Sequence, residues 1–270
     1  MLSVNLGPLS LSVGYFLVLL AFFVALVVGA LVGRRDKTPI AGTISDIFLV
    51  TMFSARIVFV LVYFEHYQDN LWSIIDIRDG GFNILAGVAG ALSWTGYLIW
   101  RRPAIRRTLG FAVASGFITW GTVMMTINLI ETQANKIPEV RFSDLNGTSM
   151  SLSQIASGKP MVVNLWASWC PPCIREMPVL AEAQQRNPNI AFVFVNQGEK
   201  TATINKFLTQ NGLELSNLLT DASGRLGRIT GSQALPTTLF YDASGRQVDA
   251  HLGELSRATL ARSLSHFSSE

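Results

Sequence analysis

The chain of 270 residues has only two cysteines and three histidines, and charged residues make up just 14% of it. A structural zinc site needs about four ligands, so this scarcity of Cys and His argues against one and we expect no metal. The net charge is +3, and no basic stripe interleaved with aromatic residues is present, which predicts no nucleic-acid partner. Low charge combined with 49% apolar residues instead predicts segments that lie in a membrane.

The apolar residues are unevenly distributed along the chain. Residues 1–136 carry long uncharged runs, whereas residues 137–270 have ordinary mixed polarity. We therefore expect two domains, an all-α transmembrane helical domain over residues 1–136 and a soluble domain over residues 137–270. A domain of roughly 130 residues is large enough to bury its own core.

Four segments are candidates for membrane spans. A helix needs about 20 apolar residues to cross the hydrocarbon core, and residues 11–33 are uncharged throughout. A cleaved signal peptide is the alternative, but no Lys or Arg precedes this run and RRDK follows it, which is the wrong charge order. The other predicted spans are residues 40–64, 82–100 and 108–130. The second contains Asp46 and Arg56, which are expected to pair, to snorkel or to line a polar cavity.

The charges of the connecting loops predict the orientation of the spans. Basic residues cluster after the first predicted span and after the third, so both loops should face the cytoplasm. The loop between the second and third spans is acidic and should face outward. With four spans and an outward N-terminus, the soluble domain is expected in the periplasm, at the inner membrane of a bacterium. A cysteine pair can cycle in that oxidising compartment.

Strand and helix patterns alternate in the soluble half, which predicts an α/β domain with a central mixed sheet. The expected strands are residues 161–166, 190–196, 237–241 and 247–252, and the expected helices are residues 171–185, 201–211 and 256–267. The last two strands are separated by a DASG turn.

Both cysteines, Cys170 and Cys173, fall where the first strand ends and a helix begins, with Pro171 and Pro172 in the first turn. The positive end of a helix favours a thiolate, so the pKa of Cys170 should be lowered and Cys170 should be the attacking thiol. Cys173 is then placed to resolve a mixed disulfide. A zinc site, a purely structural disulfide and a copper(I) carrier remain as alternatives.

The stretch WASWCPPCIREMP resembles the active-site signature of the TlpA/ResA-like thiol-disulfide reductases of the thioredoxin superfamily. The resemblance covers about residues 138–268 and implies a thioredoxin-like fold that uses a redox-active Cys170–Cys173 disulfide and no other cofactor. It also implies that Pro236, in ALPTTLFYDASG, is a cis-proline beside the disulfide, and that Glu199 manages the proton of the buried thiol. A surface glutamate that caps the next helix is the alternative for Glu199. The flank of the site would comprise Trp169, Pro171, Pro172 and Leu235.

The membrane half, at about residues 14–110, is similar to the N-terminal part of prolipoprotein diacylglyceryl transferase. The similarity lies in VGYFLVLLAFFVA, FSARIVFVLVYF and GGFNILAGVAGALSWTGYLIWRR. Where that family has its essential His, this chain has Leu85, and the family's Arg-containing signature is missing from residues 108–130. We therefore expect contact with membrane lipid but no transferase activity.

These observations predict a membrane-anchored periplasmic thiol-disulfide oxidoreductase that mainly reduces disulfides of envelope proteins. The membrane half contains no cysteine, so a separate transmembrane thiol-disulfide transporter is the expected electron donor. Three alternatives remain: an oxidant that inserts disulfides, a lipid-modifying transferase with an accessory redox domain, and a module that binds lipoprotein or copper without turnover. The substrate could be a cytochrome, a metal-site thiol or a lipoprotein thiol, and the sequence does not select among them.

Overall fold

The computed structural model describes residues 3–6, 9–131, 136–232 and 234–267. The chain forms two compact units. One consists of residues 13–74 and 81–134, and the other of residues 1–12, 75–80 and 135–270.

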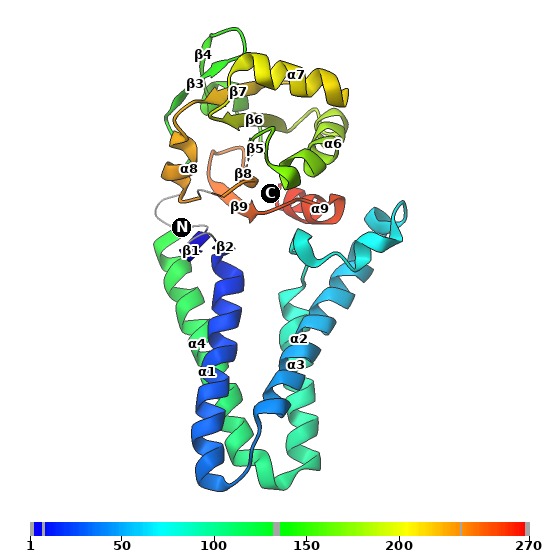
Figure 1. Ribbon diagram of the computed structural model, residues 1–270, viewed down its shortest axis with the longest axis vertical. Coiled ribbons are helices and arrows are strands. Elements are labelled where there is room, and N and C mark those ends of the chain that lie inside the picture. Colours follow the sequence, from blue (N-terminus) through cyan, green and yellow to red (C-terminus); the bar gives the residue numbers. More distant parts are fainter. Residues whose placement is uncertain (1–2, 7–8, 132–135, 233, 268–270) are drawn as a thin grey trace. The chain divides into compact units, whose positions relative to one another are not determined.

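The first unit is helical (Figure 1). Its α-helices are α1 (Val13–Asp36), α2 (Ala41–Val62), α3 (Ile84–Arg101) and α4 (Arg106–Glu131), joined by the short 3₁₀ segments η1 (Phe64–Tyr67), η2 (Leu71–Ile74) and η4 (Pro103–Ile105). Helix α1 packs along α4, and α2 packs along α3. Small residues permit the close approach of α2 and α3, because a Cβ atom at Gly87 would lie 3.3 Å from the Cβ of Ala55.

Three helices of the described residues are long and apolar enough to cross a membrane: α1, α2 and the segment Pro103–Thr126 that includes most of α4. The prediction of four spans therefore exceeds this finding by one. The third predicted span corresponds to α3, which has only 18 residues. Ser93, Thr95 and Tyr97 lower the hydropathy of α3.

Of the alternatives for Asp46 and Arg56, pairing was wrong. They are ten positions apart on α2, about 15 Å along the helix axis, and Asp46 is exposed. Arg56 is buried near the other end of α2. Its guanidinium donates hydrogen bonds to the carbonyl oxygens of Ile74, Ser73 and Gly81 at 2.9 to 3.2 Å. Arg56 thus holds the loop that joins α2 to α3.

The second unit is an α/β domain. Among the described residues, seven strands form one mixed sheet in the order β4-β3-β7-β6-β5-β8-β9. The strands are β3 (Arg141–Asp144), β4 (Ser149–Ser151), β5 (Met161–Trp166), β6 (Ala191–Gln197), β7 (Leu218–Asp221), β8 (Thr237–Tyr241) and β9 (Gln247–Leu252). The helices are α5 (Leu152–Ala156), α6 (Pro171–Arg186), α7 (Thr201–Asn211), α8 (Arg225–Thr230) and α9 (Arg257–Ser265). The unit also contains η3 (Ile77–Asp79) and the hairpin of β1 (Ser3–Leu6) with β2 (Leu9–Ser12).

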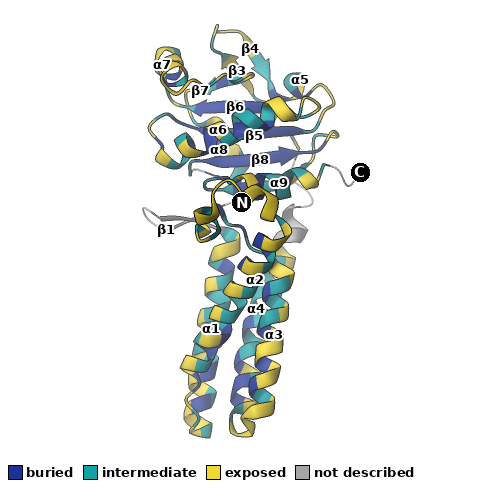
Figure 2. Ribbon diagram, turned by 90° about the vertical axis from the view of Figure 1, so that its right-hand side faces the viewer, coloured by how far each residue is buried: buried dark blue, intermediate teal, exposed yellow. Residues whose placement is uncertain are grey.

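The adjacent strands β6, β5 and β8 are buried on both faces (Figure 2). Strand β5 pairs in parallel with β6 and antiparallel with β8. Side chains alternate between two cores, so that Val162 faces α6, α7 and α9, whereas Val163 faces α5 and α8. The carboxyl end of β5 therefore lies inside the domain, and the chain leaves it directly into the segment that carries the two cysteines.

Candidate active site

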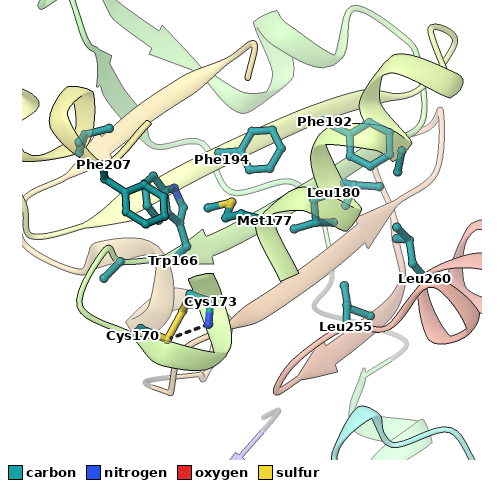
Figure 3. Close-up of a cluster of buried hydrophobic side chains, with 14 of the residues drawn as sticks. Trp166, Cys170, Cys173, Met177, Leu180, Phe192, Phe194, Phe207, Leu255 and Leu260 are labelled. Atoms are coloured by element: carbon teal, nitrogen blue, oxygen red, sulfur yellow. Dashed lines mark hydrogen bonds between the residues drawn. A yellow bond between two sulfur atoms is a disulfide. The ribbon is translucent and has the colours of Figure 1, made fainter. Parts of the chain in front are cut away.

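The two cysteines are joined in a disulfide at the N-terminus of α6 (Figure 3). Cys170 is the N-cap residue and has an extended backbone, while Cys173 lies in the first turn of the helix. The relative exposure is 4% for Cys170 and 0% for Cys173, and both side chains belong to the core under α6. Cys170 is thus the more exposed residue of the two, which agrees with its role as the attacking thiol.

The two prolines between the cysteines limit the hydrogen bonds that Cys170 can receive. Pro171 and Pro172 occupy the first helical positions and have no N–H group. The amide of Cys173 is therefore the first of the helix that reaches Cys170, with 3.3 Å between its nitrogen and Sγ. The helix end supports a thiolate at Cys170 through fewer donors than a sequence without proline would provide.

The tryptophans that flank the site differ in environment. Trp166 is fully buried at the end of β5, and its ring lies 5.3 Å from that of Phe207 on α7. Trp169, next to Cys170, is 67% exposed. An exposed aromatic ring beside a reactive sulfur offers a contact surface to a partner protein.

A buried carboxyl group lies one helical turn after the second cysteine. Glu176 is 0% exposed and lies on the same face of α6 as Cys173. Its Oε1 accepts a hydrogen bond from Asn164 Nδ2 on β5 at 2.7 Å, and its Oε2 accepts one from the backbone N of Leu255 at 2.9 Å. Burial raises the pKa of Glu176 to about 8, although the two donors oppose the shift. A carboxyl group with a pKa near the working pH is suited to proton transfer.

The loop between β9 and α9 covers this acid. Besides the amide of Leu255, the loop contributes Glu254, whose carboxylate accepts hydrogen bonds from Arg175 Nε and Nη2 at 2.8 and 2.5 Å. The amide of Gly253 donates to the carbonyl oxygen of Pro236 at 3.0 Å. One loop therefore joins the acid, the surface of α6 and the segment before β8.

The peptide bond between Leu235 and Pro236 is cis, as the resemblance to the thioredoxin superfamily implies. Pro236 is buried, and Leu235 packs against the core cluster that contains Cys170 and Cys173. The fold thus brings two segments together that are more than 60 positions apart in the sequence.

Glu199 contacts the loop before the cysteines. Its carboxylate accepts hydrogen bonds from the backbone N and Oγ of Ser168 at 2.7 and 2.5 Å, and from Asn196 Nδ2 at 2.7 Å. Ser168 lies two positions before Cys170. The structure therefore connects Glu199 to the active-site loop, whereas the buried acid closest in sequence to Cys173 is Glu176.

Sequence reasoning missed Glu176, although a signal was present. The buried face of α6 reads Cys173, Glu176, Met177, Leu180 and Ala183, so a single carboxylate occupies an otherwise apolar helical stripe. A charged residue in such a stripe is almost never buried without a partner. The partners, Asn164 and Leu255, come from distant parts of the chain.

Two family models match the chain. Redoxin matches residues 132–264, and prolipoprotein diacylglyceryl transferase matches residues 2–124. The first match confirms the predicted thioredoxin-like domain, and the second confirms the similarity of the helical half. Leu85, which the sequence comparison above leads us to expect in place of that family's essential His, is 81% exposed on α3.

Curated relatives of the chain are described as thiol-disulfide oxidoreductases or thiol:disulfide interchange proteins. The thiol-disulfide oxidoreductase ResA of Halalkalibacterium halodurans is 27% identical over 156 residues, which cover 57% of this chain and 86% of ResA. The thiol:disulfide interchange protein DsbE homolog of Paracoccus denitrificans is 40% identical over 96 residues, 36% of this chain and 52% of the homolog. A solved structure, MTB dsbF in its mixed oxidized and reduced forms, is 26% identical, with a TM-score of 0.44, and the alignment covers 48% of this chain and 95% of dsbF.

Proposed function

We propose that this chain, whose C-terminal half is a thiol-disulfide oxidoreductase domain related to ResA and DsbE, is a membrane-anchored reductase of protein disulfides. The observation that carries the proposal is the combination of the Cys170–Cys173 pair with the buried carboxyl group of Glu176 on one face of α6. The pair carries two electrons, and the acid provides a place for the proton that the buried thiol must release.

The reaction begins with the reduced pair. The Cys170 thiolate attacks one sulfur of a substrate disulfide, a Cys170–substrate disulfide forms, and the other substrate sulfur leaves as a thiolate that takes up a proton. Cys173 then gives its proton to the carboxylate of Glu176 and attacks Cys170 Sγ. The Cys170–Cys173 disulfide forms, and the second substrate sulfur is released. The substrate gains two electrons, and the cysteine pair loses two.

The two prolines favour the reducing direction. A strongly oxidising pair is one whose reduced form is stabilised, and each amide that donates to the thiolate contributes to that stabilisation. Pro171 and Pro172 remove two such donors, so the thiolate of Cys170 relies on the amide of Cys173. A less stabilised thiolate makes the disulfide harder to reduce and the dithiol a better reductant.

The electron donor in this proposal is a separate transmembrane thiol-disulfide transporter. The chain has no cysteine other than Cys170 and Cys173, so its helices cannot pass electrons across the bilayer by thiol exchange. The donor and the substrates must reach the same cysteine pair in turn. We assign the exposed ring of Trp169 as the surface that contacts the donor and the substrates in turn.

We further propose that α3 crosses the membrane with the other three helices, in the inner membrane of a bacterium, which leaves the redox domain in the periplasm. With about 1.5 Å of rise per residue, α3 spans about 27 Å, close to the roughly 30 Å of the hydrocarbon core. Gly87 and Gly90 of α3 face Ala55 and Ser54 of α2. Such close packing supports a position of α3 at the same depth in the membrane as α2. The basic residues around the α1–α2 connection and around the α3–α4 connection favour the cytoplasmic side for both loops.

The membrane half contacts lipid in this account and has no transferase role. Its exposed apolar side chains, among them Phe23, Phe53 and Ile118, suit a surrounding of lipid tails. The replacement of the essential His by Leu85 removes the transferase chemistry expected of the related family.

The proposal is tested by trapping the intermediate with the full chain in detergent. The variant Cys173→Ser keeps the attacking thiol but cannot resolve, so it should accumulate a mixed disulfide with a disulfide-bonded test protein. Cys170→Ser, the matched control, should form none. Equal trapping by both variants, or none by either, would contradict the assigned roles. Substrate binding that is unchanged in Cys173→Ser, with no disulfide reduction by the wild type, would instead indicate a module that binds without turnover.

A further inference from the structure

The amide group of Asn164 has one satisfied end and one unsatisfied end. Its Nδ2 donates to Glu176 Oε1 at 2.7 Å and to Thr238 Oγ1 at 3.0 Å. Its Oδ1 is buried and has no hydrogen-bond partner among the described residues. An unpaired buried carbonyl is costly, which raises the question of what this oxygen does.

The second carboxylate oxygen of Glu176 determines where its proton goes. Oε2 accepts the backbone N–H of Leu255, so that side is already occupied by a donor. A proton on Glu176 must therefore lie on Oε1, the oxygen that faces Asn164. A protonated Oε1 needs an acceptor, and the Nδ2 group of Asn164 is only a donor.

A half-turn of the amide resolves this conflict. It would bring Asn164 Oδ1 to the place of Nδ2, where the oxygen accepts from Glu176. The same oxygen can also accept from Thr238, because a hydroxyl group donates as readily as it accepts. Thr238 thus fits both orientations: in one, Asn164 Nδ2 donates two hydrogen bonds, and in the other, Asn164 Oδ1 accepts two.

We propose that the Asn164 amide turns over each time Glu176 gains or loses its proton, so that Asn164 is a positioning residue for the proton step. This inference rests on the proposed function, because the proton of Cys173 is the one that Glu176 receives. The donor orientation serves the ionised acid, and the acceptor orientation serves the neutral acid. Strand β8, which follows Pro236, contacts the amide through Thr238 and is thereby linked to the protonation state.

The two orientations of the Asn164 amide do not stabilise Glu176 equally. A hydrogen bond to a carboxylate is stronger than one from a neutral carboxyl group, so Asn164 favours the ionised acid. Replacing Asn164 by the similarly sized Leu removes both bonds and should raise the pKa of Glu176 by about one pH unit. A side chain that only fills space would leave the pKa where it is.

The test is a pH titration of the full, oxidised chain in lipid nanodiscs by infrared difference spectroscopy. The carbonyl band of protonated Glu176, identified by its loss in Glu176→Gln, should disappear with a midpoint of about 8 in the wild type. The midpoint should be about one unit higher in Asn164→Leu. Ser263→Ala is the matched control, since it removes another buried hydrogen bond, to Asp249 on β9, and should leave the midpoint unchanged.

A second measurement uses the wild-type chain and does not depend on the folding of a variant. In protein labelled with ¹⁵N-asparagine, the Nδ2 signals of Asn164 should shift with the same midpoint as the carboxyl band. Signals that stay constant through that titration, or an Asn164→Leu midpoint equal to that of the wild type, would overturn the inference. Neither readout needs turnover, so a chain that proves to be an oxidant would overturn the proposed function and leave this titration unaffected.

Discussion

Glu176 lies one turn after Cys173 on the buried face of α6, and neither side chain is exposed to solvent. A buried thiol can become a nucleophile only if its proton has somewhere to go, because a thiolate in an apolar core is poorly stabilised. The nearby carboxyl group provides that place. Its raised pKa lets it take up the proton near neutral pH and give it back in the opposite direction of the cycle.

The resolving step should depend on pH through Glu176. The acid accepts a proton only when ionised, so the rate of mixed-disulfide resolution should rise with pH up to about 8 and then level off. Glu176→Gln should slow resolution by about 100-fold, a typical contribution of general-base catalysis, and should remove this inflection. Stopped-flow release of a fluorescent substrate thiol measures both effects. An inflection that survives in Glu176→Gln would show that another group accepts the proton.

The same acid should make the redox domain less stable as the pH rises from about 4.5 to about 8. The pKa of Glu176 is about 8 in the folded chain and about 4.5 when unfolded. Below both values the carboxyl group is protonated in both states, and between them only the unfolded chain releases its proton, so folding weakens as pH rises.

The side chain of Glu176→Gln stays neutral. The free energy of unfolding of this variant, relative to that of the wild type, should therefore increase by about 1.4 kcal/mol per pH unit across that window. Pulse proteolysis of the full chain in increasing urea, at pH 5, 6, 7 and 8, measures the difference. Parallel stability curves for the two proteins would contradict the assignment.

Glu199 should act by positioning the active-site loop. Glu199→Gln loses at least one bond to Ser168, which should destabilise the loop by about 1 to 3 kcal/mol and lower the rate of disulfide reduction. The pH midpoint of the resolving step should stay near that of the wild type. Ser168→Ala, the milder companion variant, should reproduce part of the loss. A midpoint displaced by Glu199→Gln would instead support the direct role in proton management that the sequence suggests.

The orientation of the membrane half can be read with single cysteines in a chain carrying Cys170→Ser and Cys173→Ser. A cysteine in place of Asp69, between α2 and α3, should react with a membrane-impermeant maleimide in intact spheroplasts. One in place of Ala104, between α3 and α4, should react only after the membrane is opened. Labelling of both positions from outside would mean that α3 does not cross.

The elements with a strong local pattern could be predicted from the sequence. Strands β5, β8 and β9 and helix α7 have the predicted bounds, because their apolar periodicity and turn residues are local signals. Strands β3, β4 and β7 were missed. They are three or four residues long, with sequences such as SMS. Strands β3 and β4 form a short hairpin with each other, and this hairpin joins the sheet only because β3 pairs with the distant β7.

The candidate site was predictable to a similar extent. Cys170, Cys173 and the cis bond at Pro236 follow from motifs that can be read along the chain. The role of Glu176 depends on Asn164 and on Leu255, which is 79 positions away, and no local pattern gives such contacts. The predicted four spans exceed by one the three helices that are long and apolar enough to cross a membrane, and the remaining helix, α3, carries glycines where it packs closely on α2.

The most direct test of the reductase assignment is the reduction potential of the Cys170–Cys173 pair in the full chain. The purified protein would be equilibrated with dithiol buffers of known potential, and the free thiols would be trapped and counted. Our account predicts a value near or below that of thioredoxin, about −270 mV. A value near that of a strong oxidant such as DsbA, about −120 mV, would mean that the domain inserts disulfides and that electrons flow in the opposite direction.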